Sequence, residues 1–139
     1  MSSPSQLRNG YGPPIALLAA RRVADAALAR ALERGWNVAV AVVDPAGDLV
    51  CFVRTEQVQR GSIEVAIEKA RCAARFKRPT KAWEDRAAAS PGVIGVPGVL
   101  ALEGGVPLLS GDLIVGAVGV SGALSAEDGE CALAGLAAM

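Results

Sequence analysis

The chain has 139 residues, of which 52% are hydrophobic and only 4% aromatic, so the sequence predicts one domain with a core of small aliphatic side chains. Its 14 basic and 14 acidic residues balance, which argues against a nucleic-acid-binding surface and against a charged membrane-binding face. The chain contains no histidine, and this excludes Ser-His-Asp and Cys-His catalysis as well as histidine-ligated zinc or haem.

The three cysteines lack CxxC spacing, which indicates reduced thiols rather than a disulfide framework. No basic-then-apolar signal pattern opens the sequence, and the first apolar segment carries Arg21, Arg22 and Asp25, which do not suit a membrane-spanning helix. We therefore expect a cytoplasmic protein without membrane contacts. Because the chain is short and apolar, it is also expected to bury further surface in a homo-oligomer.

The predicted organisation is a flexible arm over residues 1–12 followed by a single domain over 13–139. Periodicity and turn residues predict, in chain order, a helix, two strands, two helices, three strands and a helix. The ranges of these elements are 13–34, 37–43, 48–54, 62–76, 81–89, 99–102, 106–110, 112–119 and 126–138.

Tight turns between neighbouring strands decide the fold class. The sequence Asp44-Pro45-Ala46-Gly47 suits a hairpin turn, and a second hairpin is expected around Gly111. Strands joined by hairpins favour an antiparallel sheet, so we expect an α+β fold with a five-stranded antiparallel sheet flanked by helices. The last helix is expected to begin at an S-x-x-D capping box formed by Ser125 and Asp128.

Lys69 stands out in the predicted helix over residues 62–76. At 100° per residue the other charged side chains of this helix gather on one stripe, whereas Lys69 lies among apolar neighbours on the far side. One interpretation is a lysine that snorkels or forms an ion pair at a subunit contact. The other is a lysine that lines a pocket, opposite the segment EGGVP at 103–107, where it binds a carboxylate or acts as an acid or base.

The segment EGGVP is the second candidate, because its two glycines leave backbone N–H groups approachable and Glu103 adds a carboxylate. It is either a tight turn or a pocket wall in which Gly104 and Gly105 stabilise a ligand oxygen. The glycines of GAVGVSG at 116–122 lack the spacing of a phosphate-binding loop and indicate close backbone packing instead. Further polar candidates are Tyr11, Arg54, Arg75 and Arg78.

Four blocks in this order resemble the GlcG/HbpS family, which includes the C-terminal domain of PduO-type corrinoid proteins. The resemblance spans about residues 14–138, and the blocks are AVVDPAGDLVCFVR, GSIEVAIEKARCAARFKRPT, GGVPLL and VGAVGVSG. It implies a profilin-like layered fold that assembles into dimers or larger oligomers, up to octamers. The family's Lys-Ala pair matches Lys69 and Ala70, and its Gly-Gly-x-Pro segment matches Gly104, Gly105 and Pro107.

The resemblance implies a haem-binding or haem-degrading protein, or one that acts beside catabolic enzymes for aromatic or organic acids. Haem or a corrinoid is the cofactor it suggests; without histidine, iron would need Tyr11, a cysteine thiolate or a methionine as its ligand. Two hypotheses from different classes follow, with a structural partner for another protein as a third. The first is an oligomer that binds a planar or carboxylate-bearing ligand through Tyr11, Arg54, Gly104, Gly105 and Pro107. The second is a cofactor-free isomerase, lyase, decarboxylase or hydratase for a small organic acid, with Lys69 and Glu103 as acid and base and no metal.

Overall fold

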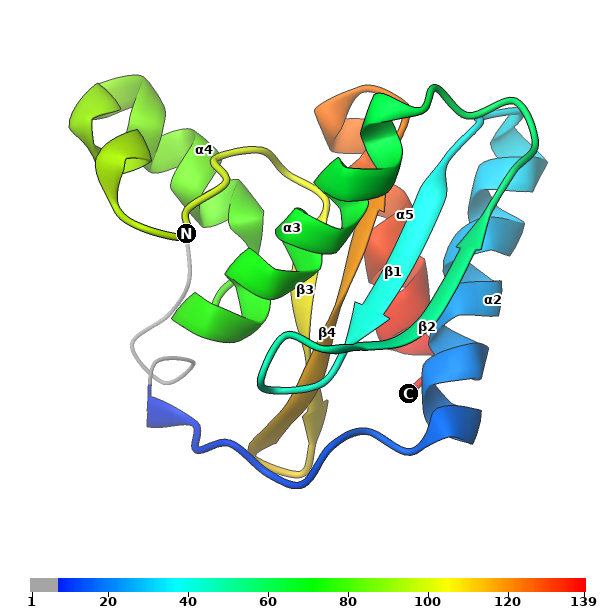
Figure 1. Ribbon diagram of the computed structural model, residues 1–139, viewed down its shortest axis with the longest axis horizontal. Helices are drawn as coiled ribbons and strands as arrows, with labels where there is room; N and C mark the ends of the chain where they lie inside the picture. Colours follow the sequence, from blue (N-terminus) through cyan, green and yellow to red (C-terminus); the bar gives the residue numbers. More distant parts are fainter. Residues whose placement is uncertain (1–7) are drawn as a thin grey trace.

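The computed structural model describes residues 8–139, and the predicted arm lies partly outside them. Element labels follow Figure 1. The helices are α2 (Leu17–Arg34), α3 (Gly61–Phe76), α4 (Thr80–Ala89) and α5 (Ser125–Ala137), with a short 3-10 helix η1 (Pro91–Gly95). The strands are β1 (Ala39–Val43), β2 (Leu49–Arg54), β3 (Gly105–Ser110) and β4 (Leu113–Ser121).

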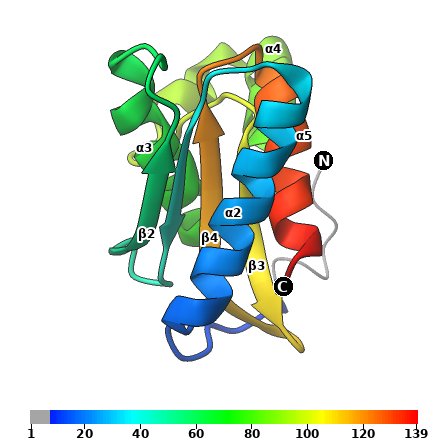
Figure 2. The ribbon, with the colours of Figure 1, turned by 90° about the vertical axis from the view of Figure 1, so that its right-hand side faces the viewer.

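The four strands of the described residues form one antiparallel sheet in the order β2-β1-β4-β3. Helices α2 and α5 cover one face of this sheet and α3 covers the other, while α4 and η1 project away from it (Figures 1 and 2). The predicted α+β class and the antiparallel hairpins are therefore correct. None of the helices in residues 8–139 is long and apolar enough to cross a membrane.

The expected fifth strand over residues 99–102 is absent, because this segment pairs with no neighbouring strand. The backbone N–H of Leu100 instead donates to the Sγ atom of Cys72 on α3, at 3.4 Å. The prolines and glycines before it hold the chain in η1 and a turn. Residues 99–102 thus have the apolar composition of a strand, but they lack the neighbouring strand with which a strand forms hydrogen bonds.

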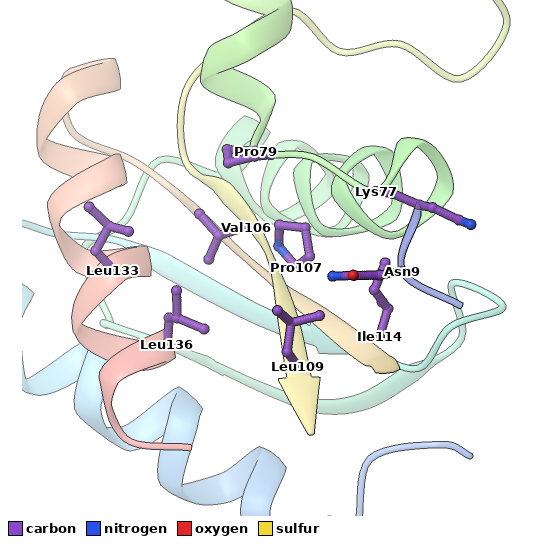
Figure 3. A pocket seen from close by; sticks show the side chains of 9 residues that line it. All are labelled: Asn9, Lys77, Pro79, Val106, Pro107, Leu109, Ile114, Leu133 and Leu136. Carbon is purple, nitrogen blue, oxygen red and sulfur yellow. The ribbon is translucent and has the colours of Figure 1, made fainter. Parts of the chain in front are cut away.

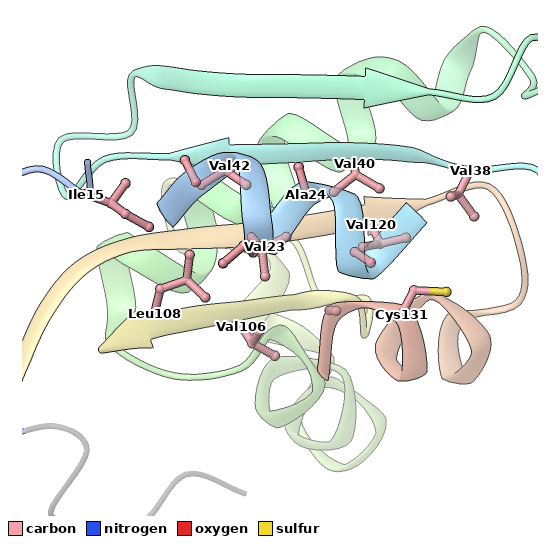
Figure 4. Close-up of a cluster of buried hydrophobic side chains, with 14 of the residues drawn as sticks. Ile15, Val23, Ala24, Val38, Val40, Val42, Val106, Leu108, Val120 and Cys131 are labelled. Atoms are coloured by element: carbon pink, nitrogen blue, oxygen red, sulfur yellow. The ribbon is translucent and has the colours of Figure 1, made fainter. Parts of the chain in front are cut away.

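Alternation along β1 explains how two helical layers pack on one central strand (Figure 4). The side chains that pack with α2 and α5 are Val38, Val40 and Val42. The side chains that pack on the α3 side are Ala39, Ala41 and Val43. Because every β1 residue is buried, this strand reads as a continuous apolar run in the sequence.

Small side chains bring α3 very close to the sheet. A Cβ at Gly119 on β4 would collide with the backbone carbonyl of Ala66 and lie 2.6 Å from the backbone nitrogen of Ala70. The close-packing interpretation of the glycines in GAVGVSG is thus correct at this position. The short distance between α3 and β4 also carries Lys69 into the protein interior.

Residues at the start of the described chain are attached to the sheet. The N–H of Gly12 donates to the carbonyl of Ile114, and the N–H of Ile114 donates to the carbonyl of Gly10. Tyr11 forms a parallel bridge with the same residue of β4. Within the predicted flexible arm, residues 10–12 are therefore hydrogen-bonded to the domain, and residues 1–7 lie outside the described part of the chain.

Candidate functional site

An apolar groove follows β3, the edge strand that has β4 as its one neighbour among the described strands. It consists of two adjoining cavities of about 190 Å³ and 150 Å³ that share Pro79, Val106 and Leu133. We call these two cavities together the β3 groove. The first is also lined by Asn9, Lys77, Pro107, Leu109, Ile114 and Leu136 (Figure 3). The second is also lined by Lys81, Glu103, Gly104, Gly105 and Gly129.

The walls of the groove come from segments that are far apart in the sequence. Leu133 and Leu136 extend from α5 on one side, and Val106 and Leu109 come from β3 (Figure 3). The loop between α3 and α4 supplies Lys77 at the rim. The groove therefore has an apolar floor and a charged rim, an arrangement suited to a ligand with an apolar body and an anionic end.

Lys69 is buried, with 2% of its side chain exposed, and does not line the β3 groove. Its Nζ atom donates to Oδ2 of Asp128 at 3.0 Å and to the carbonyl of Val120 at 3.0 Å. It lies directly behind Gly104, since a Cβ on that glycine would be 2.9 Å from Nζ. The ammonium thus lies beside EGGVP but does not line a pocket, because it is buried in an ion pair behind the backbone of this segment.

Asp128 is the partner that the sequence analysis missed. The sequence predicts a helix-capping role for Asp128, whereas its Oδ1 accepts the N–H of Ala123 and its Oδ2 accepts a hydrogen bond from Lys69 Nζ. The helix instead begins after Leu124, whose N–H donates to Glu127. Burial raises the pKa of Asp128, and the Lys69 ammonium partly offsets this rise. The available signal was Lys69 itself, because a buried ammonium requires a carboxylate.

Glu103 lines the second cavity. Partial burial raises its pKa, and the ammonium of Lys81 opposes the rise. Its carboxylate packs on Gly129 of α5, where a Cβ would collide with it. The Lys69 ammonium also lowers the pKa of Glu103, but no hydrogen bond or ion pair joins these two residues in the described part of the chain. They do not face the same cavity.

The glycines of EGGVP line the second cavity, but one of their N–H groups has a partner already. The N–H of Gly105 donates to Oγ1 of Thr80 at 2.9 Å. Gly104 has a φ of +133° and its carbonyl accepts the N–H of Val120. Pro107 lines the first cavity. Because the Gly105 N–H is already bound to Thr80, EGGVP does not offer the pair of free amides that an oxyanion site needs.

Tyr11 and Arg54 are separated from one another by the sheet. The Tyr11 hydroxyl donates to the carbonyl of Ala74 at 2.7 Å, with the carbonyl of Arg75 at 3.2 Å, and the Lys77 ammonium lies 4.9 Å from its ring centroid. Arg54 is exposed at the end of β2, the opposite edge of the sheet from β3. Tyr11 is thus beside the β3 groove, and Arg54 is not.

Ligands for haem iron do not converge in the described part of the chain. The thiols of Cys72 and Cys131 are buried, and burial raises the pKa of both, that of Cys131 to about 12. Burial also raises the pKa of the Tyr11 hydroxyl, which already donates to backbone carbonyls. No group of three metal-ligating side chains occurs among residues 8–139. Burial raises the pKa of the Cys51 thiol as well, so the three cysteines and Tyr11 favour their protonated forms and do not fit a thiolate or phenolate ligand to haem iron.

The fold and the groove define a class: a small α+β protein with one antiparallel sheet and an apolar groove along an edge strand. The sequence model described as "Haem degrading protein HbpS-like" matches residues 15–137. The chain belongs to this HbpS-like family, which confirms the resemblance seen in its sequence blocks. GlcG of Escherichia coli K12 is 36% identical over 92 residues, which are 66% of this chain and 69% of GlcG.

Solved structures agree with the family assignment. A double mutant of HbpS from Streptomyces reticuli is 31% identical, with a TM-score of 0.84, 100% of this chain covered and 94% of that one. A crystal structure described as a PduOC:heme complex has a TM-score of 0.81 and covers 91% of this chain and 95% of its own. At 24% identity, this structural similarity shows a shared fold alone.

Proposed function

We propose that this protein binds a small planar or apolar molecule with a carboxylate in the β3 groove. The observation that carries this proposal is the leucine-, valine- and proline-lined surface with Lys77 at the rim of the first cavity. Lys81 lines the second cavity, where it is paired with Asp85 and shares the lining with Glu103. An apolar body removes this apolar surface from water, and a lysine ammonium pairs with the carboxylate. The membership in a haem-related family supports a ligand of this chemistry.

Size favours a small organic acid over a tetrapyrrole for a single subunit. The two cavities measure about 190 and 150 Å³. Pockets for drug-sized ligands span about 300–1,000 Å³, so each cavity alone suits a smaller molecule. A tetrapyrrole would extend beyond the groove and need a wall from a second subunit.

A homo-oligomer is part of the proposal. Large apolar side chains are exposed at several places on the surface, among them Leu18 at 69%, Ile94 at 66% and Leu124 at 72%. Large apolar side chains that are this exposed are candidates for burial in a subunit interface. Assembly of copies would bury them and would supply the further wall for a larger ligand.

Iron plays no part in the proposed binding, because the donor set does not fit it. Haemin and metal-free protoporphyrin IX should then behave alike, since both present the same ring edge and the same carboxylates. An affinity for haemin that protoporphyrin lacks would mean that iron ligation contributes and that this part of the proposal is wrong.

A second candidate, a cofactor-free enzyme for a small organic acid, retains one favourable observation. Glu103 has a raised pKa at the wall of a cavity, as a general acid or base requires. Lys69 would act only indirectly in such an enzyme, because its ammonium is bound by Asp128 behind Gly104. Turnover that survives Lys69→Met and disappears in Glu103→Gln would support this candidate.

Calorimetric titration with 2-naphthoate tests the proposed site, with the neutral alcohol 2-naphthalenemethanol as the ligand control. Leu133 lines both cavities and is 55% exposed, so Leu133→Glu blocks the groove with a like charge while the fold is kept. Leu32→Glu is the matched control, since Leu32 is 62% exposed on α2 and lines neither cavity.

We expect saturable binding of naphthoate, weaker binding of the alcohol, and a loss of at least about tenfold in affinity in Leu133→Glu alone. Protoporphyrin IX is titrated in parallel as the larger probe. If neither compound binds, or if both variants bind as the parent does, the β3 groove is not the ligand site.

A further inference from the structure

The corner between α3 and α4 contains an aromatic and basic cluster outside the β3 groove. Trp83 on α4 has 5% of its surface exposed, and its ring meets Phe76 of α3 edge-on, with centroids 5.2 Å apart. The guanidinium carbons of Arg78 and Arg86 lie 5.0 and 5.6 Å from the centre of the Trp83 ring. Two cations are thus held on one indole.

No carboxylate of the described chain neutralises these two guanidinium groups. Nε of Arg78 donates to the carbonyl of Phe76. The acidic side chains of α4 have other partners: Asp85 accepts Lys81, and Glu84 accepts the N–H of Glu103. Like charges near one another with no counter-charge destabilise the protein, and a bound anion would reverse that effect.

The indole N–H of Trp83 supplies an independent observation. Its Nε1 atom is buried and has no hydrogen-bond acceptor in the part of the chain that the structure describes. A buried donor without an acceptor is unfavourable and uncommon in folded proteins. Arg86, whose guanidinium carbon lies over the ring, is exposed and makes no ion pair within residues 8–139, so its guanidinium is open to an anion from solvent.

From this cluster we infer a second binding site, for a small oxyanion such as a carboxylate or a phosphate, between the last residues of α3 and the first turns of α4. The anion oxygens accept hydrogen bonds from Arg78, Arg86 and the N–H of Trp83. Arginine suits this role because its planar group offers several donors to one oxyanion. The indole fixes the direction of both guanidinium groups by stacking.

This oxyanion site is distinct from the β3 groove. Neither Trp83, Arg78 nor Arg86 lines that groove, whereas Lys81 does. At 100° per residue, Trp83 and Arg86 share one side of α4, and Lys81 is about 160° away from Trp83 around the helix. The inference therefore does not depend on the ligand proposed for the groove.

Tryptophan fluorescence can report on this site, because the chain has two tryptophans and Trp36→Phe leaves Trp83 as the reporter. Phosphate and acetate are titrated into this variant at constant ionic strength, with chloride as the control anion. We expect a saturable change in Trp83 emission with phosphate or acetate and none with chloride. The anion that binds more tightly identifies the class of ligand.

Arg78→Gln/Arg86→Gln in the same background should weaken anion binding by about tenfold or more, because charge-assisted hydrogen bonds are lost. Arg22→Gln, an exposed arginine on α2, is the control and should bind as the parent does. Trp83→Phe keeps an aromatic ring but removes the indole N–H, so calorimetry should show weaker anion binding in this variant.

A fluorescence change that follows ionic strength alone would overturn the inference. So would equal affinity in the double arginine variant. A third contradicting result is an unresponsive emission together with a change of oligomeric state in the double variant, which would assign the cluster to a subunit contact instead.

Discussion

Lys69→Met provides a severe test of the buried ion pair. The side chains of Lys69 and Asp128 are 2% and 3% exposed, and Nζ lies 3.0 Å from Oδ2. Methionine has a similar length and shape but leaves Asp128 without its cation. Removing one partner of a buried pair costs about 3–5 kcal/mol in the free energy of unfolding. At about 2.1 cal/mol/K of unfolding entropy per residue, this corresponds in a 139-residue domain to a fall of roughly 10–17 °C in Tm.

Three further variants separate this cause from a general loss of packing. Lys81→Met removes the lysine of an exposed pair with Asp85, at 3.2 Å, and should leave the free energy of unfolding almost unchanged. Asp128→Asn in the Lys69→Met background keeps an acceptor for the N–H of Ala123 and removes the unpaired charge. This double variant should be more stable than Lys69→Met alone, by an amount given by a double-mutant cycle with Asp128→Asn.

The stability deficit of Lys69→Met should also change with pH, in a direction that the pKa of Asp128 determines. Burial raises the pKa of Asp128, and Lys69 lowers it, so the pKa in the folded variant should be higher still. A folded-state pKa above the unfolded value means that stability is present at low pH and is lost as pH rises through the folded-state pKa. The deficit of Lys69→Met in urea unfolding should therefore be smaller near pH 4.5 than at pH 8. A deficit no larger than that of Lys81→Met, or one independent of pH, would refute the reasoning.

Three other results should follow from the described geometry. Gly104→Ala should lower Tm much more than Gly111→Ala. Both glycines have a positive φ, but only at Gly104 would a Cβ also lie 2.6 Å from the carbonyl oxygen of Val120. Equal losses of Tm would contradict this. Burial raises the pKa of Glu103 in the folded protein above its ordinary value of 4.5. The free energy of unfolding of the parent, relative to that of Glu103→Gln, should therefore fall as the pH rises above about 4.5. Urea unfolding at several pH values measures this. A thiol reagent at pH 8 should modify Cys51 before Cys131, which is buried with a pKa of about 12; mass mapping of the first adduct checks the order.

The parts of the fold that depend on local chemistry could be predicted from the sequence. The turn at Asp44 is an example, because its Oδ1 accepts the N–H groups of Ala46 and Asp48 within the turn itself. The expected strand over 99–102 shows where local patterns fail. Apolar composition alone could not tell that the N–H of Leu100 binds Cys72, a residue 28 positions earlier in the chain.

The candidate site shows the same division between local and distant information. Helical periodicity singled out Lys69 as misplaced, and EGGVP was expected to form a wall opposite it. The ion pair with Asp128 joins residues 59 positions apart, so no local pattern contained it. The role of the α5 leucines that form one wall of the groove could not be predicted either, because it depends on the position of α5 beside β3.

The measurement that tests the account most directly is a map of ligand contacts by two-dimensional NMR. Uniformly ¹⁵N-labelled protein is titrated with 2-naphthoate, and the shifts of the backbone amides are followed. The account predicts the largest changes at Val106, Leu109, Leu133 and Leu136, with little change at Arg54 on the opposite edge of the sheet. Changes that centre on residues outside the β3 groove, or none at saturating ligand, would contradict the assignment of this groove as the binding site.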